Sequence, residues 1–354
     1  MSPLLLEHVR RIPPAPTVGE QSAVGRPGSL ATEVIDEMEY SGHEMEAGTF
    51  DHQPVMLGEV MAVLATAPSG PVLDATLGGG GHAAALLEMR PDATIIGMDR
   101  DERAIAAAAD CLARFGDRVV LRHAAFGELR QVLLDLGTRE LAGFIFDLGV
   151  SSPQLDRPER GFSYRGPGPL DMRMDRRQTR TAADVVNGYT ESELADVLSM
   201  HSGERYARRI ARALVAARPV GDTAELAELV RSAIPAPARR RGGHPAKRTF
   251  QAIRIEVNTE LEQLPRALDE AIDRLVPGGR GVVLSYHSGE DRLVKDRFDT
   301  AMTGGCTCPP RLPCACGATP RAVVARRRAL RPTPEEVDVN PRASSARMRT
   351  VERA

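Results

Sequence analysis

The sequence predicts an α/β fold in which a mostly parallel, helix-covered sheet is interrupted by a helical, arginine-rich insertion. Between about residues 52 and 148, short apolar runs alternate with segments of helical periodicity. Such alternation favours right-handed crossovers and parallel strand pairing. It stops after Asp147 and resumes near Thr249, and a length of 354 residues suits one sheet domain with a large insertion.

The elements of the sheet domain are expected to follow one another as alternating strands and helices. We predict strands over residues 71–74, 94–99, 119–121, 141–148 and 281–286, and helices over residues 55–66, 83–90, 101–115, 126–136 and 249–275. Gly116 follows the third of these helices in the position of a C-terminal stop. A Pro-Gly-Gly turn at 277–279 precedes the last strand.

The same reading divides the chain into three parts. Residues 1–50 hold scattered Pro, Gly and acidic residues with little periodicity, which predicts a disordered N-terminal extension, with a short helix near 35–40 as the one expected element. Residues 51–155 and 249–354 are assigned to the sheet domain, which ends in a basic tail. Residues 156–248 are assigned to an inserted helical domain.

Two helix starts and a basic helix are predicted inside the insertion. Thr190 with Glu193, and Asp222 with Glu225, have the spacing of N-terminal capping residues. Residues 204–217 read as a basic helix, and residues 235–247 as a flexible basic loop.

Charge is segregated along the chain although the formal net charge is only −2. Residues 157–254 hold 19 basic and 11 acidic residues, and residues 301–354 hold 10 basic and 4 acidic ones. Residues 51–156, by contrast, hold 8 basic and 15 acidic residues. Two basic zones beside an acidic body indicate a polyanionic partner such as RNA. Residues 156–248 are therefore assigned to an inserted helical RNA-recognition domain. With eight Phe, five Tyr and no Trp, the sequence does not predict a surface that binds RNA by stacking many bases on aromatic rings.

No targeting or membrane segment is expected. The apolar runs are far shorter than the roughly 20 residues of a membrane helix, and the N-terminus lacks the organisation of a secretory signal. We therefore expect a cytoplasmic protein. Of five cysteines, four lie within residues 306–316 as two Cys-x-Cys pairs. Because structural zinc sites usually space their cysteines more widely, we favour a reduced loop, with a metal site as the open alternative.

Four loops at the carboxyl ends of the predicted strands have the chemistry of a nucleoside-binding site. The first is the loop from Asp74 to His82, whose four glycines allow close backbone approach and lead into a helix N-terminus. Asp99 ends the second strand and can accept hydrogen bonds from ribose hydroxyls. Phe126 follows the third strand, where it can cover an adenine ring. Asp147 ends the fourth.

The glycine loop alone does not separate two kinds of cofactor, because it also fits the dinucleotide fingerprint. Asp74 stands at the end of the first predicted strand, where the glycine loop begins and where its carboxylate would repel a pyrophosphate. It could instead bind an ammonium group, such as that of S-adenosylmethionine. We therefore favour S-adenosylmethionine over a nicotinamide dinucleotide.

Asp147 is the candidate catalytic residue. The exocyclic nitrogen of a base is a poor nucleophile because its lone pair is delocalised into the ring. A hydrogen-bond acceptor on its N–H frees that lone pair for attack on the methyl group of S-adenosylmethionine. Placing the nitrogen in line with that methyl group can lower the barrier by roughly 7–11 kcal/mol. The alternative is that Asp147 only caps the following turn or orders the cofactor.

Long ordered motifs in residues 50–354 resemble the MraW/RsmH family, the bacterial 16S rRNA cytosine-N4 methyltransferases. The matching stretches are His52–Met56, Asp74–His82, Met98–Asp101, Asp147–Asp156, Arg160–Tyr164, Gly168–Asp175, Arg248–Ile255, Leu284–Arg292 and Asn340–Ala343. The resemblance implies a class I, Rossmann-like methyltransferase sheet with an inserted helical substrate domain. It also implies S-adenosylmethionine as cofactor and a target cytosine in the decoding region of 16S rRNA.

Carried onto this sequence, the resemblance implies cofactor contacts from Gly80, Gly81, His82, Asp99, Phe126, Asp147 and Gln154. For the RNA we expect phosphate contacts from arginines, and base contacts beside the last strand, from Arg173, Arg208, Arg248, Tyr286 and His287. The expected partner is 16S rRNA within the small ribosomal subunit or a late precursor of it, and a homodimer is left open.

Three rival functions stay open at this point. A cytosine-C5 RNA methyltransferase needs a cysteine nucleophile, for which Cys314 is the superficial candidate. An RNA-binding ribosome-assembly factor could retain a vestigial methyltransferase fold. A nicotinamide oxidoreductase would use the glycine loop for a dinucleotide.

Overall fold

The computed structural model describes residues 54–240, 243–309 and 314–354. The N-terminal extension and the helix expected near residues 35–40 lie outside the described residues. Residues 51–354 form one compact unit. No described helix is both long and apolar enough to cross a membrane.

The centre of the fold is a seven-stranded sheet with the order β3-β2-β1-β4-β5-β7-β6. The strands are β1 (Pro71–Asp74), β2 (Thr94–Asp99), β3 (Val119–His123), β4 (Leu141–Asp147), β5 (Leu275–Ser285), β6 (Ala322–Val323) and β7 (Arg347–Arg353). The first five are parallel, whereas β7 runs antiparallel to both β5 and β6. Strand order reverses between β1 and β4, which is where open α/β sheets bind their ligands. The predicted Rossmann-like α/β fold is confirmed.

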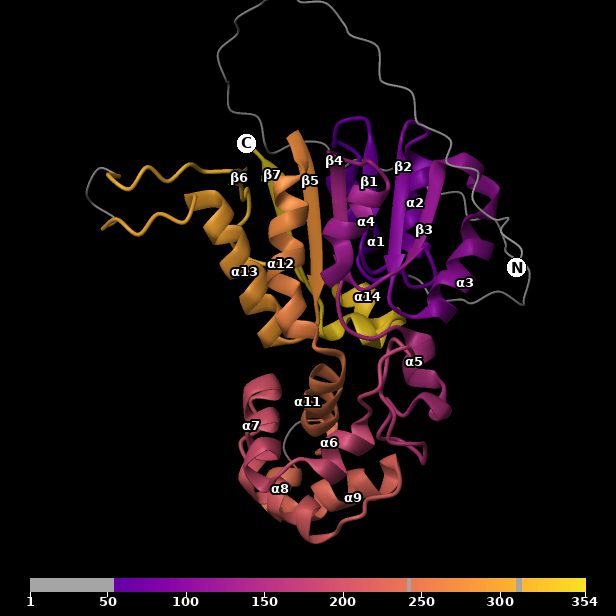
Figure 1. The fold of residues 1–354 in the computed structure, drawn as a ribbon, viewed down its shortest axis with the longest axis vertical. Coiled ribbons are helices and arrows are strands. Elements are labelled where there is room, and N and C mark those ends of the chain that lie inside the picture. The colour runs from indigo at the N-terminus through magenta and orange to yellow at the C-terminus, as the bar shows by residue number, and fades with distance from the viewer. Residues whose placement is uncertain (1–53, 241–242, 310–313) are drawn as a thin grey trace, which may run out of the picture. The chain divides into compact units, whose positions relative to one another are not determined.

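Helices cover both faces of this sheet (Figure 1). One face carries α1 (Leu57–Leu64), α2 (Gly81–Met89) and α3 (Glu102–Leu112), and the other carries α4 (Leu129–Asp135), α12 (Glu260–Asp273) and α13 (Ser288–Thr303). Successive strand residues alternate between the two cores: Val72 and Ile145 pack on the first face, and Leu73, Phe144 and Phe146 on the second. A strand buried on both sides therefore reads as a continuous apolar run.

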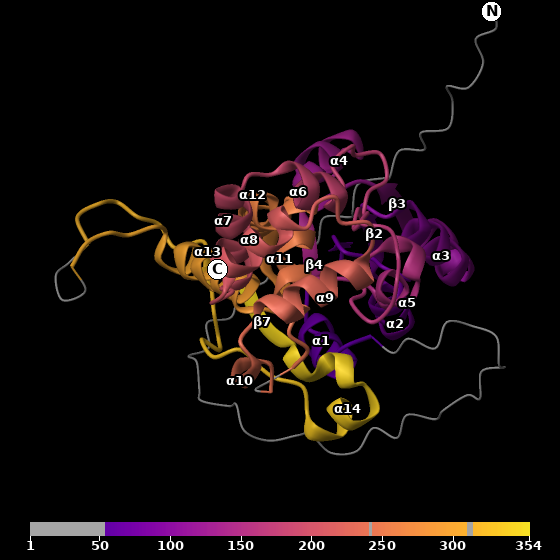
Figure 2. The same ribbon diagram turned by 90° about the horizontal axis from the view of Figure 1, so that it is seen from below.

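The insertion builds a core of its own beyond the carboxyl ends of the parallel strands (Figures 1 and 2). The short helix α5 (Ser152–Asp156) leads into it, and it contains α6 (Ala182–Gly188), α7 (Glu191–Ser202), α8 (Ala207–Ala216), α9 (Thr223–Ala233) and α10 (Ala236–Arg239). Both predicted helix starts are confirmed. The side chains of Thr190 and Asp222 accept hydrogen bonds from the backbone N–H groups of Glu193 and Glu225, at 3.3 and 2.8 Å.

The single helix predicted over residues 249–275 is wrong. The chain forms α11 (Lys247–Asn258) and α12, separated by Thr259, whose φ of 49° is left-handed. Tertiary contacts account for the break, because the Asn258 amide donates to Met172 O at 2.8 Å and accepts from Met174 N at 2.9 Å. Since α11 contributes Phe250, Ile253 and Val257 to the core of the insertion, we propose to extend that domain to residue 258.

The C-terminal segment is more than the basic tail that the sequence predicted. It contains β6, β7 and α14 (Pro334–Val339). Arginines obscure the strand pattern of β7, but they are paired: Arg347 and Arg349 each bind Asp291 of α13, at 2.8 and 2.7 Å. The β5 strand also begins earlier than predicted, at Leu275, and its pairing with β4 is irregular near the Pro-Gly-Gly turn.

Candidate active site

The glycine loop after β1 is open on one side and closely packed on the other. Gly78 and Gly80 have φ values of 53° and 85°, a region that favours glycine. A Cβ added to Gly79 would meet nothing within 4 Å, whereas one on Gly81 would lie 2.5 Å from Pro54 Cγ. The loop therefore leaves room for a ligand at Gly79 while Gly81 lets α2 pack against the preceding chain.

Asp99, at the end of β2, holds this loop in place. Its two carboxylate oxygens accept hydrogen bonds from Gly78 N and Asp101 N, both at 2.8 Å. Burial raises its pKa above the ordinary value, and those backbone N–H groups oppose the shift. Each oxygen keeps a further lone pair, so the contact with ribose hydroxyls remains a prediction that this geometry allows.

Asp74 at the end of β1 is almost fully buried, and burial raises its pKa to about 8. The negative charges of Asp147 and Asp99 act in the same direction, and a hydrogen bond from Thr76 N opposes them. At pH 7 the carboxyl therefore mostly holds its proton. Three acidic side chains around one loop suit a cationic ligand, and a pyrophosphate would add unfavourable charge.

His82 is neutral at pH 7, because burial lowers its pKa to about 4. Its Nε2 lies 3.1 Å from Val55 O, and since a carbonyl only accepts, Nε2 carries the proton. The other nitrogen, Nδ1, lies 3.9 Å from Asp147 Oδ2. Because the ring is uncharged and that distance exceeds a hydrogen bond, the two do not form an ion pair at neutral pH.

Asp147 is oriented from two sides at the end of β4. The hydroxyl of Tyr286 donates to Asp147 Oδ1 at 2.7 Å, and Asp147 N donates to Thr76 Oγ1 at 2.5 Å. A quarter of the Asp147 side chain remains exposed. Burial and the charge of Asp147 raise the pKa of Tyr286, so its hydroxyl stays protonated and keeps donating. Residue Gly149, at a φ of 99°, would place a Cβ 3.3 Å from the Tyr286 ring.

Gln154 and Phe126 lie behind this edge and are largely buried. The Gln154 amide donates to Asp101 Oδ2 at 3.0 Å and accepts from Ser151 N at 3.1 Å. One amide hydrogen is thus left for the predicted cofactor contact. The Phe126 ring packs 6.2 Å from the Phe146 ring, measured between centroids, and its role over an adenine stays a prediction.

The sequence reasoning missed a buried ion pair that joins the insertion to the loop edge. Arg160 Nη1 lies 2.8 Å from Asp101 Oδ2, and both side chains are at least nine-tenths buried. Arg160 also donates to Arg173 O and Met174 O, at 3.0 and 3.3 Å. Asp101 lies two residues after Asp99, so its closeness to a predicted cofactor residue could have identified it from the sequence. Nothing in the sequence marks Arg160 as buried.

The predicted RNA-contacting residues fall into three environments. Tyr286 and His287 line a cavity of about 380 Å³ whose other lining residues are Ser288, Arg331, Ser344, Ser345, Ala346 and Arg347. Arg208 on α8 and Arg248 on α11 are exposed on the insertion. Arg173 is already bound to Asp171 Oδ1 through Nε at 2.7 Å. The sequence reasoning missed Ser344 and Ser345, which directly follow the Asn340–Ala343 motif. It also missed the two arginines of the cavity, of which Arg347 comes just after that motif and Arg331 nine residues before it.

His287 has a structural task beside that cavity. Its Nδ1 accepts from Gly289 N and Glu290 N, at 3.2 and 3.4 Å, and so caps α13. Its Nε2 lies 3.1 Å from Glu290 Oε1 but does not meet the geometry of a hydrogen bond. The ring is therefore held in place by its own helix, with one edge at the cavity.

Comparison with known proteins identifies the family. The profile of the MraW methylase family matches residues 49–354. The ribosomal RNA small subunit methyltransferase H of Thermobifida fusca is 52% identical over 309 residues, covering 85% of this chain and 93% of that protein. Its namesake in Symbiobacterium thermophilum is 50% identical over 307 residues, covering 85% and 96%. The chain therefore belongs to the MraW methylase family, a family of S-adenosylmethionine-dependent methyltransferases, as its motifs led us to expect.

Proposed function

We propose that this protein transfers the methyl group of S-adenosylmethionine to the exocyclic N4 of a cytosine in the decoding region of 16S rRNA. The relatives named above are small-subunit rRNA methyltransferases, which supports the substrate class. The observation that carries the proposal is the Asp147 carboxylate, partly exposed beside the glycine loop and oriented by the Tyr286 hydroxyl at 2.7 Å.

The glycine loop and its acidic residues would hold the cofactor. The sulfonium of S-adenosylmethionine would supply an activated methyl group, and the rest of the cofactor would leave as a neutral thioether. Gly79 offers the open side of the loop, Asp99 the acceptors for ribose, and Asp74 the charge that matches a cation. Because Asp74 has a pKa of about 8 when the site is empty, a bound cation would draw it toward the ionised form.

Asp147 would act on the amine. The Asp147 carboxylate, held in place by the Tyr286 hydroxyl, would accept an N4–H and direct the nitrogen lone pair at the methyl carbon. The nearby Asp147 carboxylate would stabilise the positive charge that N4 gains when it takes up the methyl group. The proton that N4 then loses passes to Asp147 or to water. No enzyme nucleophile takes part.

The cavity beside Tyr286 would receive RNA next to the target base. It carries two arginines, a histidine and three serines, which suit phosphate and sugar oxygens. Exposed arginines of α8 add positive charge on the insertion. The expected substrate is 16S rRNA within the small subunit or a late precursor of it, in the cytoplasm, and a homodimer remains a prediction.

The C5 rival is disfavoured by the position of Cys314. The α13 helix starts at Ser288, beside the cavity, and its 16 residues span about 24 Å before the cysteine-containing segment begins. Cys314 lies in that segment, within 3.5 Å of another cysteine sulfur. An RNA-binding assembly factor with a vestigial methyltransferase fold would bind RNA without transferring a methyl group. Methyltransferase activity would therefore exclude this rival, and RNA binding without that activity would support it.

The test is methyl transfer from labelled S-adenosylmethionine to small subunits isolated from cells that lack this protein, followed by mass spectrometry of the nucleosides. We expect N4-methylcytidine with the unmodified protein and with Cys314→Ser, and a loss of at least 100-fold in rate with Asp147→Asn. Methylation at C5, or full activity of Asp147→Asn, would contradict the proposal.

A further inference from the structure

An excursion of the chain between α13 and β6 lacks a hydrophobic core. We call residues 304–309 and 314–321 the cysteine excursion; they leave the end of α13 and return to Ala322 at the start of β6 (Figure 1). None of the side chains described in these two ranges is buried. Ordering a surface segment of this length costs conformational entropy that apolar burial does not offset here.

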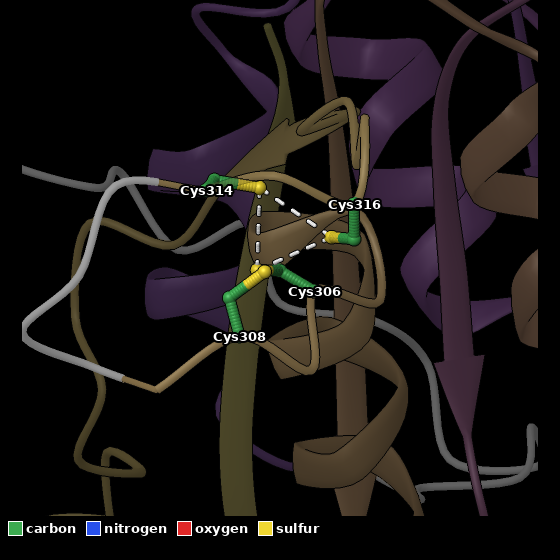
Figure 3. Close-up of side chains that lie close together, drawn as sticks. All are labelled: Cys306, Cys308, Cys314 and Cys316. Carbon is green, nitrogen blue, oxygen red and sulfur yellow. Dashed lines mark hydrogen bonds between the residues drawn. The ribbon is translucent and has the colours of Figure 1, made fainter.

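Four thiols nevertheless meet in this excursion (Figure 3). The sulfur of Cys306 lies 3.5 Å from that of Cys314 and 3.6 Å from that of Cys316, and the last two are 3.4 Å apart. Cys308 completes the group, and all four sulfur atoms lie within 4.8 Å of one another. These separations are far longer than the roughly 2.05 Å of a disulfide, so the cysteines are reduced and converge on a common centre.

We propose that Cys306, Cys308, Cys314 and Cys316 bind one Zn²⁺ ion in a tetrahedral, purely structural site. A zinc–sulfur distance of about 2.3 Å places tetrahedral sulfur ligands roughly 3.8 Å apart. The three separations of 3.4–3.6 Å form a nearly equilateral triangle of that scale, which is one face of such a tetrahedron. Four soft thiolates in a closed set select zinc over hard cations such as Mg²⁺ or Ca²⁺.

The Cys-x-Cys spacing favoured a reduced loop over a metal site, because such a spacing strains one pair of ligands around a tetrahedral ion. Cys314 and Cys316 bring their sulfur atoms within 3.4 Å of each other despite a single intervening residue. The backbone N–H of that residue, Ala315, points at Cys308 Sγ at 3.4 Å. An N–H···S hydrogen bond of this kind fixes the orientation of a thiolate that binds a metal ion. The two Cys-x-Cys pairs thus approach each other from the two described parts of the cysteine excursion.

Zinc would replace the missing hydrophobic core of the excursion. Metal coordination that exists only in the folded state contributes its binding free energy to local folding. The site lies at the far end of α13 from the Tyr286 cavity, so metal loss should loosen the excursion and leave cofactor binding intact. This proposal does not depend on the reaction, since its readouts are metal content and local order.

The experiment uses the full chain, expressed with zinc in the medium and purified without chelators. We expect about one zinc per chain by elemental analysis, and after exchange a cobalt form with the intense sulfur-to-cobalt charge-transfer absorption of tetrahedral thiolate sites. The double variant Cys306→Ser/Cys314→Ser should lose at least nine-tenths of the metal. Hydrogen exchange of the excursion should rise in that variant while the sheet domain keeps its melting temperature.

The matched control is Cys111→Ser, because Cys111 is the remaining cysteine, exposed on α3 and outside the group. It should keep the full metal content. The proposal is overturned if the purified chain holds less than a tenth of a zinc ion and gives no cobalt spectrum. It is also overturned if Cys111→Ser loses metal as fully as the double variant, or if the four cysteines are recovered as two disulfides under reducing purification.

Discussion

Replacing Asp74 by asparagine tests the electrostatics of the cofactor site most directly. Burial and two neighbouring carboxylates raise the pKa of Asp74 from 3.8 to about 8 in the empty site. A cationic cofactor should bind the ionised form, so binding at pH 7 should release the proton that Asp74 holds. From that pKa the expected release is about 0.9 proton at pH 7 and about 0.1 at pH 9.

The assay is calorimetry of S-adenosylmethionine binding in two buffers that differ in ionisation enthalpy. The amino group of the cofactor titrates in the same range, but the difference between the unmodified protein and Asp74→Asn cancels its contribution. At pH 9 the variant should bind roughly 10- to 150-fold more weakly, since a charge-assisted contact is worth about 1.5–3 kcal/mol. At pH 7 the difference in cofactor affinity between the two proteins should be about tenfold smaller, because ionising Asp74 at that pH costs about 1.4 kcal/mol.

The stability of the empty protein gives an independent check with a definite sign. Between the unfolded pKa of 3.8 and the folded pKa of about 8, the folded state holds a proton that the unfolded chain has released. This group's contribution to stability is therefore lost as pH rises through that window, by about 1.4 kcal/mol per unit. Asp74→Asn should lack that slope. Equal proton release and equal pH slopes in both proteins would refute the reasoning.

Three further predictions concern other contacts. Arg160→Met should destabilise the fold by about 3–5 kcal/mol, because it leaves the buried carboxylate of Asp101 without its counter-charge; Arg103→Met, which breaks a half-exposed pair, should cost less than about 1 kcal/mol in the same denaturant titration. Tyr286→Phe should lower kcat about tenfold through loss of one hydrogen bond, with cofactor affinity unchanged by calorimetry; an unaltered kcat would remove this hydroxyl from the mechanism. Arg208→Ala should weaken RNA binding and reduce the slope of log K against log salt by about one in filter-binding assays; an unchanged slope would show that α8 makes no phosphate contact.

Local sequence chemistry was sufficient for the parallel half of the sheet. The boundaries of β1 and β2 were predicted to the residue, because both are short apolar runs bounded by turns and each ends in an acid. The caps Thr190 and Asp222 were predictable for the same reason, since a cap bonds only to its own helix. The strand β7 was missed because its arginines are balanced by Asp291, a residue more than fifty positions away.

By itself the amino-acid sequence determined the α/β class, the acidic ends of the strands and the glycine loop, since each depends on neighbours a few residues apart. Only the tertiary structure decided that Thr259 breaks a helix, that Arg160 is buried against Asp101, and that four closely spaced cysteines turn their sulfur atoms to one point. The first two outcomes depend on contacts between distant segments, and the third on how the two Cys-x-Cys pairs turn toward each other. Burial and long-range hydrogen bonding can override the local preference for a helix or strand, and neither can be predicted from a single short segment of the sequence.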